Sequence, residues 1–245
     1  MVEEENIYDK IQEIFGTMPA NLNVLEEEID VDLQMEYFEH SKNHKTSLSM
    51  EEIIQKKDDI FLEGISVPEK KDRLVELASI ENIEAYRTIQ RYLQEPEDDL
   101  RDWAMLALQE SRMLIESKLL DENQIFISTG LGGKGFKLRY FVVILSRNFS
   151  DFTRMQRKII RNEFEYILKK VDAEIEEIRF RKNMSSILAI IPLNISIKDI
   201  FRRAIEESNQ YGDFIKTNFL VTNVKKLSFR EIKDFVEKQR LQEKI

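Results

Sequence analysis

The sequence has no cysteine, two histidines, four prolines and seven glycines among its 245 residues. Without cysteine it forms no disulfide, thiolate metal site or cysteine nucleophile, and this composition fits a reducing compartment. The longest apolar runs, 140–145 and 187–193, are far too short to span a bilayer. The first residues, MVEEENIYDK, lack the apolar segment of a signal peptide. We therefore expect a cytoplasmic protein that does not bind membranes.

Charge is abundant, and its two signs are unevenly distributed along the chain. Residues 1–127 contain 13 lysines and arginines against 31 aspartates and glutamates, a net charge of −18. Residues 128–245 contain 24 basic and 15 acidic residues, a net charge of +9. A basic half favours contact with nucleic acid, but two domains whose fields attract each other would show the same division. Both interpretations stay open.

The first half has the pattern of helices. Apolar residues at helical spacing predict helices at 6–15, 22–40, 67–79, 82–94 and 97–119. The stretches SMEE at 49–52 and SVPE at 66–69 match the capping box that begins a helix. We expect residues 1–121 to form an acidic, all-helical domain.

One stretch of this half carries a family resemblance. Residues 95–108, EPEDDLRDWAMLAL, resemble the second half of a HEAT repeat, with a proline, acidic residues, an arginine and then small residues and leucines. The residues that fit its packed helix face are Leu100, Trp103, Ala104, Ala107, Leu108 and Leu114. The resemblance implies a helical scaffold that binds other proteins, and it carries no catalytic residues.

The second half alternates between two periodicities. β-rich runs at 137–145, 176–181, 186–193 and 218–224 are interleaved with amphipathic helices at 152–171 and 197–211, and a last helix follows at 228–240. The order β-α-β-β-α-β matches the ferredoxin-like arrangement.

We therefore expect an α+β protein in which residues 122–245 form a basic ferredoxin-like α/β-sandwich domain. The run QIFIST at 124–129 would add a strand that forms a hairpin with the first core strand. The whole arrangement resembles a family of bacterial proteins that combine a helical part with an α/β part, and this resemblance implies no known activity.

Four of the seven glycines lie in the stretch STGLGGKG, residues 128–135. A Walker loop requires serine or threonine after its lysine and a helix after the loop, whereas Gly135 follows Lys134 and a predicted strand comes next. The glycines at 130, 132 and 135 fill the letters of a dinucleotide-binding pattern, but the required helix is again missing. The stretch is typical of a β-hairpin loop whose glycines adopt positive φ angles.

Basic residues cluster in the second half. Four of them lie at i, i+3, i+4 and i+7 on one face of the helix predicted at 152–171, and others follow near residue 180. Such a surface suits the phosphate backbone of a nucleic acid, although a solvated helix face has the same composition. The candidate polyanion-binding residues are Lys134, Arg154, Arg157, Lys158, Arg161, Arg179, Arg181 and Lys182.

The two histidines, His40 and His44, are four residues apart, so a helix would place both on one side. They could form half of a zinc site if Glu36 or Glu39 helped, but the local sequence is also typical of a helix end.

The sequence shows no assembled catalytic motif, and we expect neither a cofactor nor a metal. The leading hypothesis is a non-enzymatic adaptor that acts through a protein partner. The alternative is an RNA- or ribosome-associated protein that uses the basic half. An enzyme with a cleft between its domains is a third class that the sequence leaves open.

Overall fold

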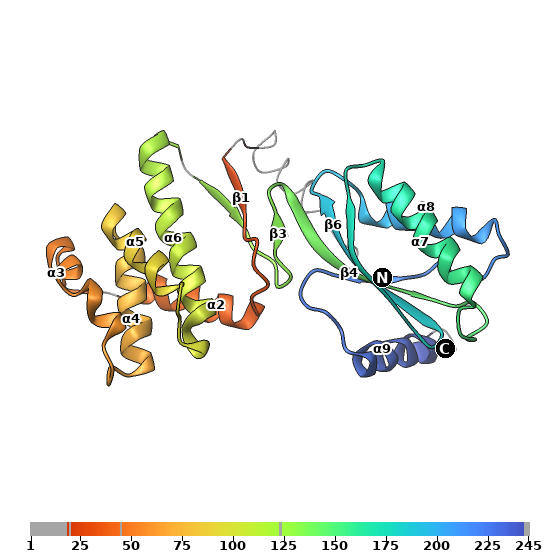
Figure 1. Cartoon of the computed structure of the whole chain (residues 1–245), viewed down its shortest axis with the longest axis horizontal. Coiled ribbons are helices and arrows are strands. Elements are labelled where there is room, and N and C mark those ends of the chain that lie inside the picture. Colours follow the sequence, from red (N-terminus) through yellow and green to blue (C-terminus); the bar gives the residue numbers. More distant parts are fainter. Residues whose placement is uncertain (1–18, 20, 45, 123, 243–245) are drawn as a thin grey trace. The chain divides into compact units, whose positions relative to one another are not determined.

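The computed structural model describes residues 19, 21–44, 46–122 and 124–242, so the helix predicted at 6–15 lies outside the described residues. The described chain divides into a helical unit, residues 21–23 and 29–127, and a sheet unit, residues 24–28 and 128–242. The expected α+β class is confirmed, with a helical first part followed by a sheet (Figure 1).

The helical unit is built around one long helix, α6 (Arg101–Leu120), which packs against three others. Its helices are α2 (Val31–Asn43), α3 (Met50–Gln55), α4 (Val67–Ala78), α5 (Ile83–Tyr92) and α6, with 3-10 turns η1 (Lys57–Phe61) and η2 (Asp98–Leu100). The two largest side chains of its core, Tyr37 and Trp103, are fully buried and meet edge to face with ring centroids 5.0 Å apart.

Both predicted capping boxes are present. Ser49 with Glu52 begins α3, and Ser66 with Glu69 begins α4. Of the residues expected on the packed face of the long helix, Leu100, Trp103, Ala104 and Ala107 are buried, whereas Leu108 and Leu114 are half-buried. Apolar periodicity and capping chemistry therefore locate these helices correctly.

The helix predicted at 22–40 is wrong in its first part. Residues Leu22–Val24 form strand β1, which pairs with β2 (Ile125–Ile127) in a two-stranded sheet. Helix α2 begins only at Val31, because the side chain of Asp30 accepts hydrogen bonds from the backbone N–H groups of Asp32 and Leu33. The apolar residues before Asp30 fit helical spacing, but the pairing with β2 is decided by contacts distant in sequence.

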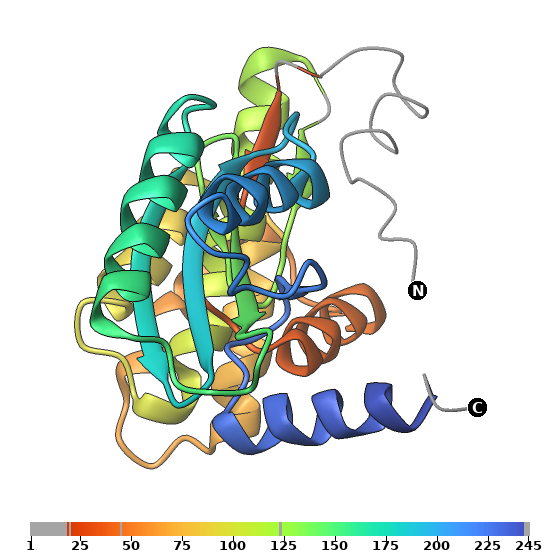
Figure 2. The same cartoon turned by 90° about the vertical axis from the view of Figure 1, so that its right-hand side faces the viewer.

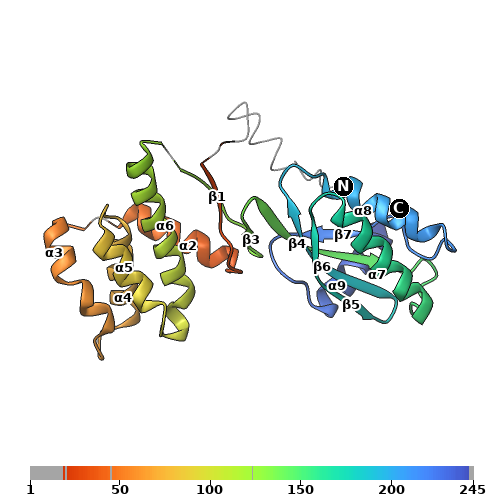
Figure 3. The ribbon, with the colours of Figure 1, turned by 45° about the horizontal axis from the view of Figure 1, so that its top comes forward.

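The sheet unit contains a central antiparallel sheet with the order β3–β4–β6–β5 (Figure 3). Its strands are β3 (Gly133–Lys134), β4 (Lys137–Leu145), β5 (Glu174–Arg181), β6 (Met184–Pro192) and β7 (Leu220–Thr222), and β7 pairs with β4. Its helices are α7 (Arg154–Lys169), α8 (Ile197–Asn209) and α9 (Phe229–Gln242). From β4 to β7, the chain follows the order β-α-β-β-α-β.

Helices α7 and α8 lie side by side on one face of this sheet, and α9 lies on the other (Figures 1 and 2). Phe164 of α7 and Phe201 of α8 are buried with ring centroids 5.9 Å apart. On the opposite face, Ile232 of α9 packs into a cluster with Phe141 and Val143 of β4. Both faces of the sheet are thus at least partly covered, and β5 is left at its edge.

The additional hairpin strand is present, but not where QIFIST placed it. Residues 125–127 pair with β1, and the short strand β3 forms the hairpin with β4, with Gly133 opposite Leu138 and Lys134 opposite Lys137. Among the described residues, no helix is both long enough and apolar enough to cross a membrane.

Candidate nucleic-acid interface

Helix α7 presents the predicted row of basic side chains. Its start is fixed by a capping box between Thr153 and Gln156, and Ile160 and Phe164 turn towards the sheet, where they are fully buried. This orientation leaves Arg154, Lys158 and Arg161 exposed and Arg157 half-buried, which are the four residues at i, i+3, i+4 and i+7.

Two of these arginines lie over an aromatic ring on the edge strand. The guanidinium carbons of Arg157 and Arg161 lie 5.6 Å and 5.2 Å from the ring centroid of Phe180 in β5. Arg157 also donates its Nε–H to the carbonyl oxygen of Phe152 at 2.9 Å, and Arg161 donates from Nη2 to that of Ile178 at 3.2 Å. The two guanidinium groups are therefore held in place, and each keeps further N–H donors for a ligand.

The end of β5 adds three more basic residues. Arg181 and Lys182 lie 4.2 Å and 5.5 Å from the ring centroid of Phe229 at the start of α9. Arg179 is exposed and forms an ion pair with Glu177 of the same strand. We call the group of Arg154, Arg157, Lys158, Arg161, Arg179, Arg181 and Lys182 the basic edge, because it follows α7 and the edge strand.

Most of the basic edge has no acidic partner among the residues that the structure describes. Within the described part of the chain, Arg179 is its only member with an ion pair. Some cations elsewhere in the sheet unit do have partners: Arg139 pairs with Glu176 at 2.5 Å, and Lys137 pairs with Asp172 at 2.8 Å. The hydrogen bonds that Arg139 donates to the carboxylate of Glu176 raise the pKa of Arg139. The basic edge is thus a local concentration of unpaired positive charge.

The structure separates Lys134 from the basic edge. Lys134 lies in β3, and two strands, β4 and β6, stand between β3 and the edge strand β5. Neighbouring strands are about 4.8 Å apart, so Lys134 is roughly 14 Å from that edge.

The glycine-rich stretch has a structural role in this unit. Gly132 and Gly135 have φ angles of 67° and 58°, as a hairpin loop requires. A Cβ atom on Gly132 would lie 2.4 Å from the carbonyl oxygens of Glu26 and Glu27, so its absence lets the segment 24–28 pack against the loop. The backbone N–H of Gly135 donates to Oε1 of Glu26 at 3.2 Å. The backbone N–H of Gly135, which could have bound a phosphate, therefore donates its hydrogen bond to the carboxylate of Glu26.

Sequence reasoning missed the aromatic residues that organise the basic edge. Phe180 contacts Phe152 as well as the two arginines, and Phe229 contacts the other end of the edge. The available signal was the alternation in IEEIRFR, 175–181, which places Ile178 and Phe180 on the face covered by α7 and α8, and Arg179 and Arg181 on the face that carries α9.

No family model matches the chain, and no curated protein matches it. Among solved structures, the chain is similar to a putative transposase from Deinococcus radiodurans R1, with 13% identity and a TM-score of 0.38 over 44% of this chain and 94% of that chain. It is also similar to a REP-associated tyrosine transposase bound to a REP hairpin, with 12% identity and a TM-score of 0.32 over 41% of this chain and 61% of that chain.

These similarities contradict the leading hypothesis from the sequence. Both neighbours are named as transposases, and one of them is bound to a REP hairpin, whereas the sequence led us to expect a non-enzymatic adaptor; that expectation is contradicted and is not retained. The protein partner that an adaptor would need loses its support as well. At these identities and TM-scores the likeness assigns no activity or substrate to this chain.

Proposed function

We propose that the protein binds nucleic acid through the basic edge of its sheet unit. The observation that carries this proposal is the absence of an ion pair on every basic-edge residue except Arg179, within the described residues. Binding phosphates would neutralise this charge and release counterions from the nucleic acid, which is the main source of sequence-independent affinity.

The anchoring of Arg157 and Arg161 supports the same role. A long basic side chain loses rotamer freedom when it binds a phosphate, and this loss weakens binding. Here the carbonyl oxygens of Phe152 and Ile178 and the ring of Phe180 already restrict the two side chains. A planar guanidinium held in this way can present two N–H groups to one phosphate.

The position of Lys182 points in the same direction. It adopts a φ angle of 51° in the turn between β5 and β6, a conformation that costs a residue with a side chain about 1–2 kcal/mol. Glycine or asparagine would fill this position at lower cost. A lysine there places an exposed charge at the tip of the basic edge. The cytoplasmic location that the lack of cysteine predicted would give the protein access to nucleic acid.

The test is fluorescence anisotropy with the full chain and a labelled mixed-sequence single strand, made once as DNA and once as RNA, over a series of salt concentrations. The double variant Arg157→Gln with Arg161→Gln removes two phosphate contacts. We expect it to weaken binding at low salt and to reduce the slope of log K against log[salt] by about 1.4 for a single strand.

A charge-matched control comes from the neighbouring helix. The double variant Arg202→Gln with Arg203→Gln removes the same charge from exposed positions on α8, and we expect affinity and slope close to those of the wild type. Equal weakening by both double variants would show a response to net charge alone and would reject the basic edge as the site. Absence of binding to DNA and RNA at low salt would reject the function itself.

A further inference from the structure

The helical unit brings three metal-ligating side chains together from two helices. His40 of α2 and His44, which caps the end of that helix, lie on one side, with stacked rings 5.5 Å apart and 23° between their planes. Asp72 of α4 faces both of them: its Oδ1 lies 2.8 Å from Nε2 of His40 and 3.6 Å from Nδ1 of His44. The three residues each offer one ligand atom, and these three atoms all lie within 4.8 Å of one another.

We propose that His40, His44 and Asp72 bind a divalent transition-metal ion of the zinc type. Bonds of about 2.0–2.1 Å in a tetrahedral site place ligand atoms roughly 3.3 Å apart, and the two measured nitrogen–oxygen separations, 2.8 Å and 3.6 Å, lie on either side of this value. Two imidazoles and one carboxylate form a ligand set that such ions favour. The site has three protein ligands and a fourth position open to water.

A further carboxylate orients one of the proposed ligands. Oε1 of Glu76 lies 3.4 Å from Nε2 of His44, the ring nitrogen that faces away from the proposed ion. If Nε2–H of His44 donates a hydrogen bond to Glu76, the proton stays on Nε2, and the lone pair of Nδ1 is available to bind the metal. This pairing of carboxylate and imidazole is the common second layer of a zinc site.

Glu76 is itself held in place and buried, with 7% of its side chain exposed. Its two oxygens accept hydrogen bonds from Thr46 Oγ1 at 2.9 Å and from Arg73 Nη1 at 2.6 Å. These two hydrogen bonds hold the Glu76 carboxylate in place beside His44.

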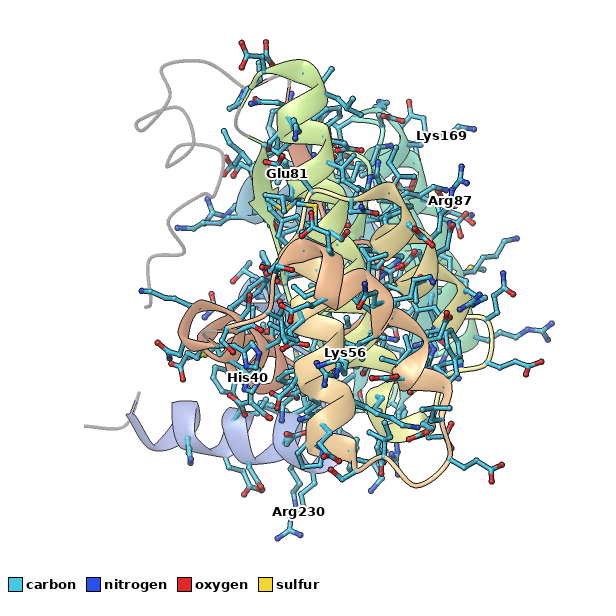
Figure 4. All side chains as sticks on the ribbon, turned by 90° about the vertical axis from the view of Figure 1, so that its left-hand side faces the viewer. His40, Lys56, Glu81, Arg87, Lys169 and Arg230 are labelled. Atoms are coloured by element: carbon cyan, nitrogen blue, oxygen red, sulfur yellow. The ribbon has the colours of Figure 1, made fainter. Side chains whose placement is uncertain are left out.

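An ion can reach the cluster from solvent. A surface pocket opens beside it, lined by Glu36, Glu39, His40, Asn43 and His44. Figure 4 draws the side chains as sticks and labels His40. The side chains of His40 and Asp72 are 36% and 41% exposed, so coordination needs no opening of the core.

The alternative role of the cluster is an ion pair that joins α2 to α4 with no metal. Isothermal titration calorimetry of zinc into the full, untagged chain distinguishes the two roles, because only a metal site binds zinc. We expect one zinc ion per chain, and we expect His44→Ala and Asp72→Asn each to weaken binding by at least about tenfold, since each removes a ligand. Glu76→Gln should weaken it by roughly tenfold as a positioning change.

A matched control separates the site from general acidity. Glu39→Gln changes an exposed carboxylate in the same pocket that is not one of the three ligands, and we expect zinc affinity within twofold of the wild type. If Glu39→Gln weakens binding as much as Asp72→Asn does, the ion is held by diffuse negative charge and the assignment is overturned.

Trp103 offers a second readout. It is the only tryptophan of the chain, and its ring centroid lies 5.4 Å from that of His40. Co²⁺ in the site should quench its emission, and Zn²⁺ should reverse the quenching in the wild type but cause no change in Asp72→Asn. The variants must keep the wild-type circular dichroism spectrum. Absence of both zinc heat and cobalt quenching in the folded wild type would overturn the proposal.

Discussion

The backbone N–H of Gly135 donates a hydrogen bond of 3.2 Å to the side chain of Glu26, more than a hundred residues earlier in the chain. The same segment is held at two more points, since Arg139 donates to the carbonyl oxygen of Glu26 at 3.4 Å and Lys226 pairs with Glu28 at 2.6 Å. The glycine-rich loop therefore holds residues 24–28 against the rest of the sheet unit. The backbone N–H of Gly135 is bonded to Glu26 rather than available to a ligand.

This docking predicts different costs for alanine at two glycines of the loop. Gly132 and Gly135 both have positive φ angles, but only Gly132 has backbone oxygens within 2.4 Å of a new Cβ, and nothing lies within 4 Å of one on Gly135. We expect Gly135→Ala to lower the free energy of unfolding by about 1–2 kcal/mol from its conformation alone. Gly132→Ala should cost about 1–3 kcal/mol more, because the segment 24–28 must move.

Urea denaturation of the two variants measures this difference. Equal losses of stability in Gly132→Ala and Gly135→Ala would show that the close approach of residues 24–28 contributes nothing, because the φ penalty is common to both.

Because Lys182 combines a positive φ angle with an exposed charge, we expect its replacement by glycine to change stability and binding in opposite directions. Lys182→Gly relieves a φ angle of 51° but increases the entropy of the unfolded chain, so we expect a stability gain between zero and about 1 kcal/mol. Loss of the charge should weaken nucleic-acid binding and reduce the salt slope by about 0.7 for a single strand. Denaturation and anisotropy on the same preparation test both expectations.

Two further variants at this position separate charge from conformation. Lys182→Arg should keep the affinity, and Lys182→Asn should weaken it as Lys182→Gly does while tolerating the positive φ angle. Unchanged binding in Lys182→Asn would exclude the tip of the β5–β6 turn from the interface.

Glu231 predicts a dependence of α9 on pH. Hydrogen bonds from Lys225 and from the side chain and backbone of Ser228 lower the pKa of this exposed carboxyl from 4.5 to about 2. A lowered pKa in the folded state means that the ionised carboxylate stabilises the helix start above pH 4.5, and that this contribution is lost as the pH falls towards about 2.

The measurement compares the wild type with Glu231→Gln from pH 6 to pH 2. We expect the variant to be less stable at pH 6 and the two curves to converge as the pH falls. A carboxyl titration by NMR should give the Glu231 side chain a pKa near 2. An ordinary glutamate titration would show that the capping contact with Ser228 is not formed in solution.

Tyr37 predicts a buried phenol that resists ionisation. Its hydroxyl donates to Oε2 of Glu110 at 2.6 Å, and its side chain is fully buried. Burial, and then the charge of Glu110, raise the pKa of Tyr37 well above its usual value. Because the phenol must stay protonated in the folded state, its contribution to stability is present at neutral pH and is lost as the pH rises above about 10.

Absorbance at 295 nm tests this expectation. In a slow pH titration, the wild type and Tyr37→Phe should ionise the same number of tyrosines before unfolding, and the wild type should ionise one more than the variant after it. The variant removes the Tyr37 donor from Glu110 and leaves only the hydrogen bond from Ser41 at 2.8 Å among those described, so it should cost about 1–3 kcal/mol. A stability equal to the wild type would mean that water replaces the phenol at no cost.

Local chemistry in the sequence determined most of the secondary structure. The capping boxes at Ser49 and Ser66 begin helices as predicted, and the β-branched run at 137–145 is a strand over its whole length. These features depend on neighbours within a few residues, where side-chain hydrogen bonds and apolar periodicity decide the backbone conformation. The sequence also placed the four basic residues of α7 on one helix face, because helical spacing alone sets that arrangement.

Contacts between distant residues were decided only by the tertiary structure. Leu22–Val24 is a strand because Ile125–Ile127 pairs with it, and no spacing near residue 22 contains that information. In the same way, the spacing of His40 and His44 predicts that they lie on one side of a helix. Asp72 joins them only because α4 brings its carboxylate to 2.8 Å from Nε2 of His40. Phe180 organises Arg157 and Arg161 for the same reason. Periodicity determines which way a side chain faces on its own element, and only packing between elements determines what it meets there.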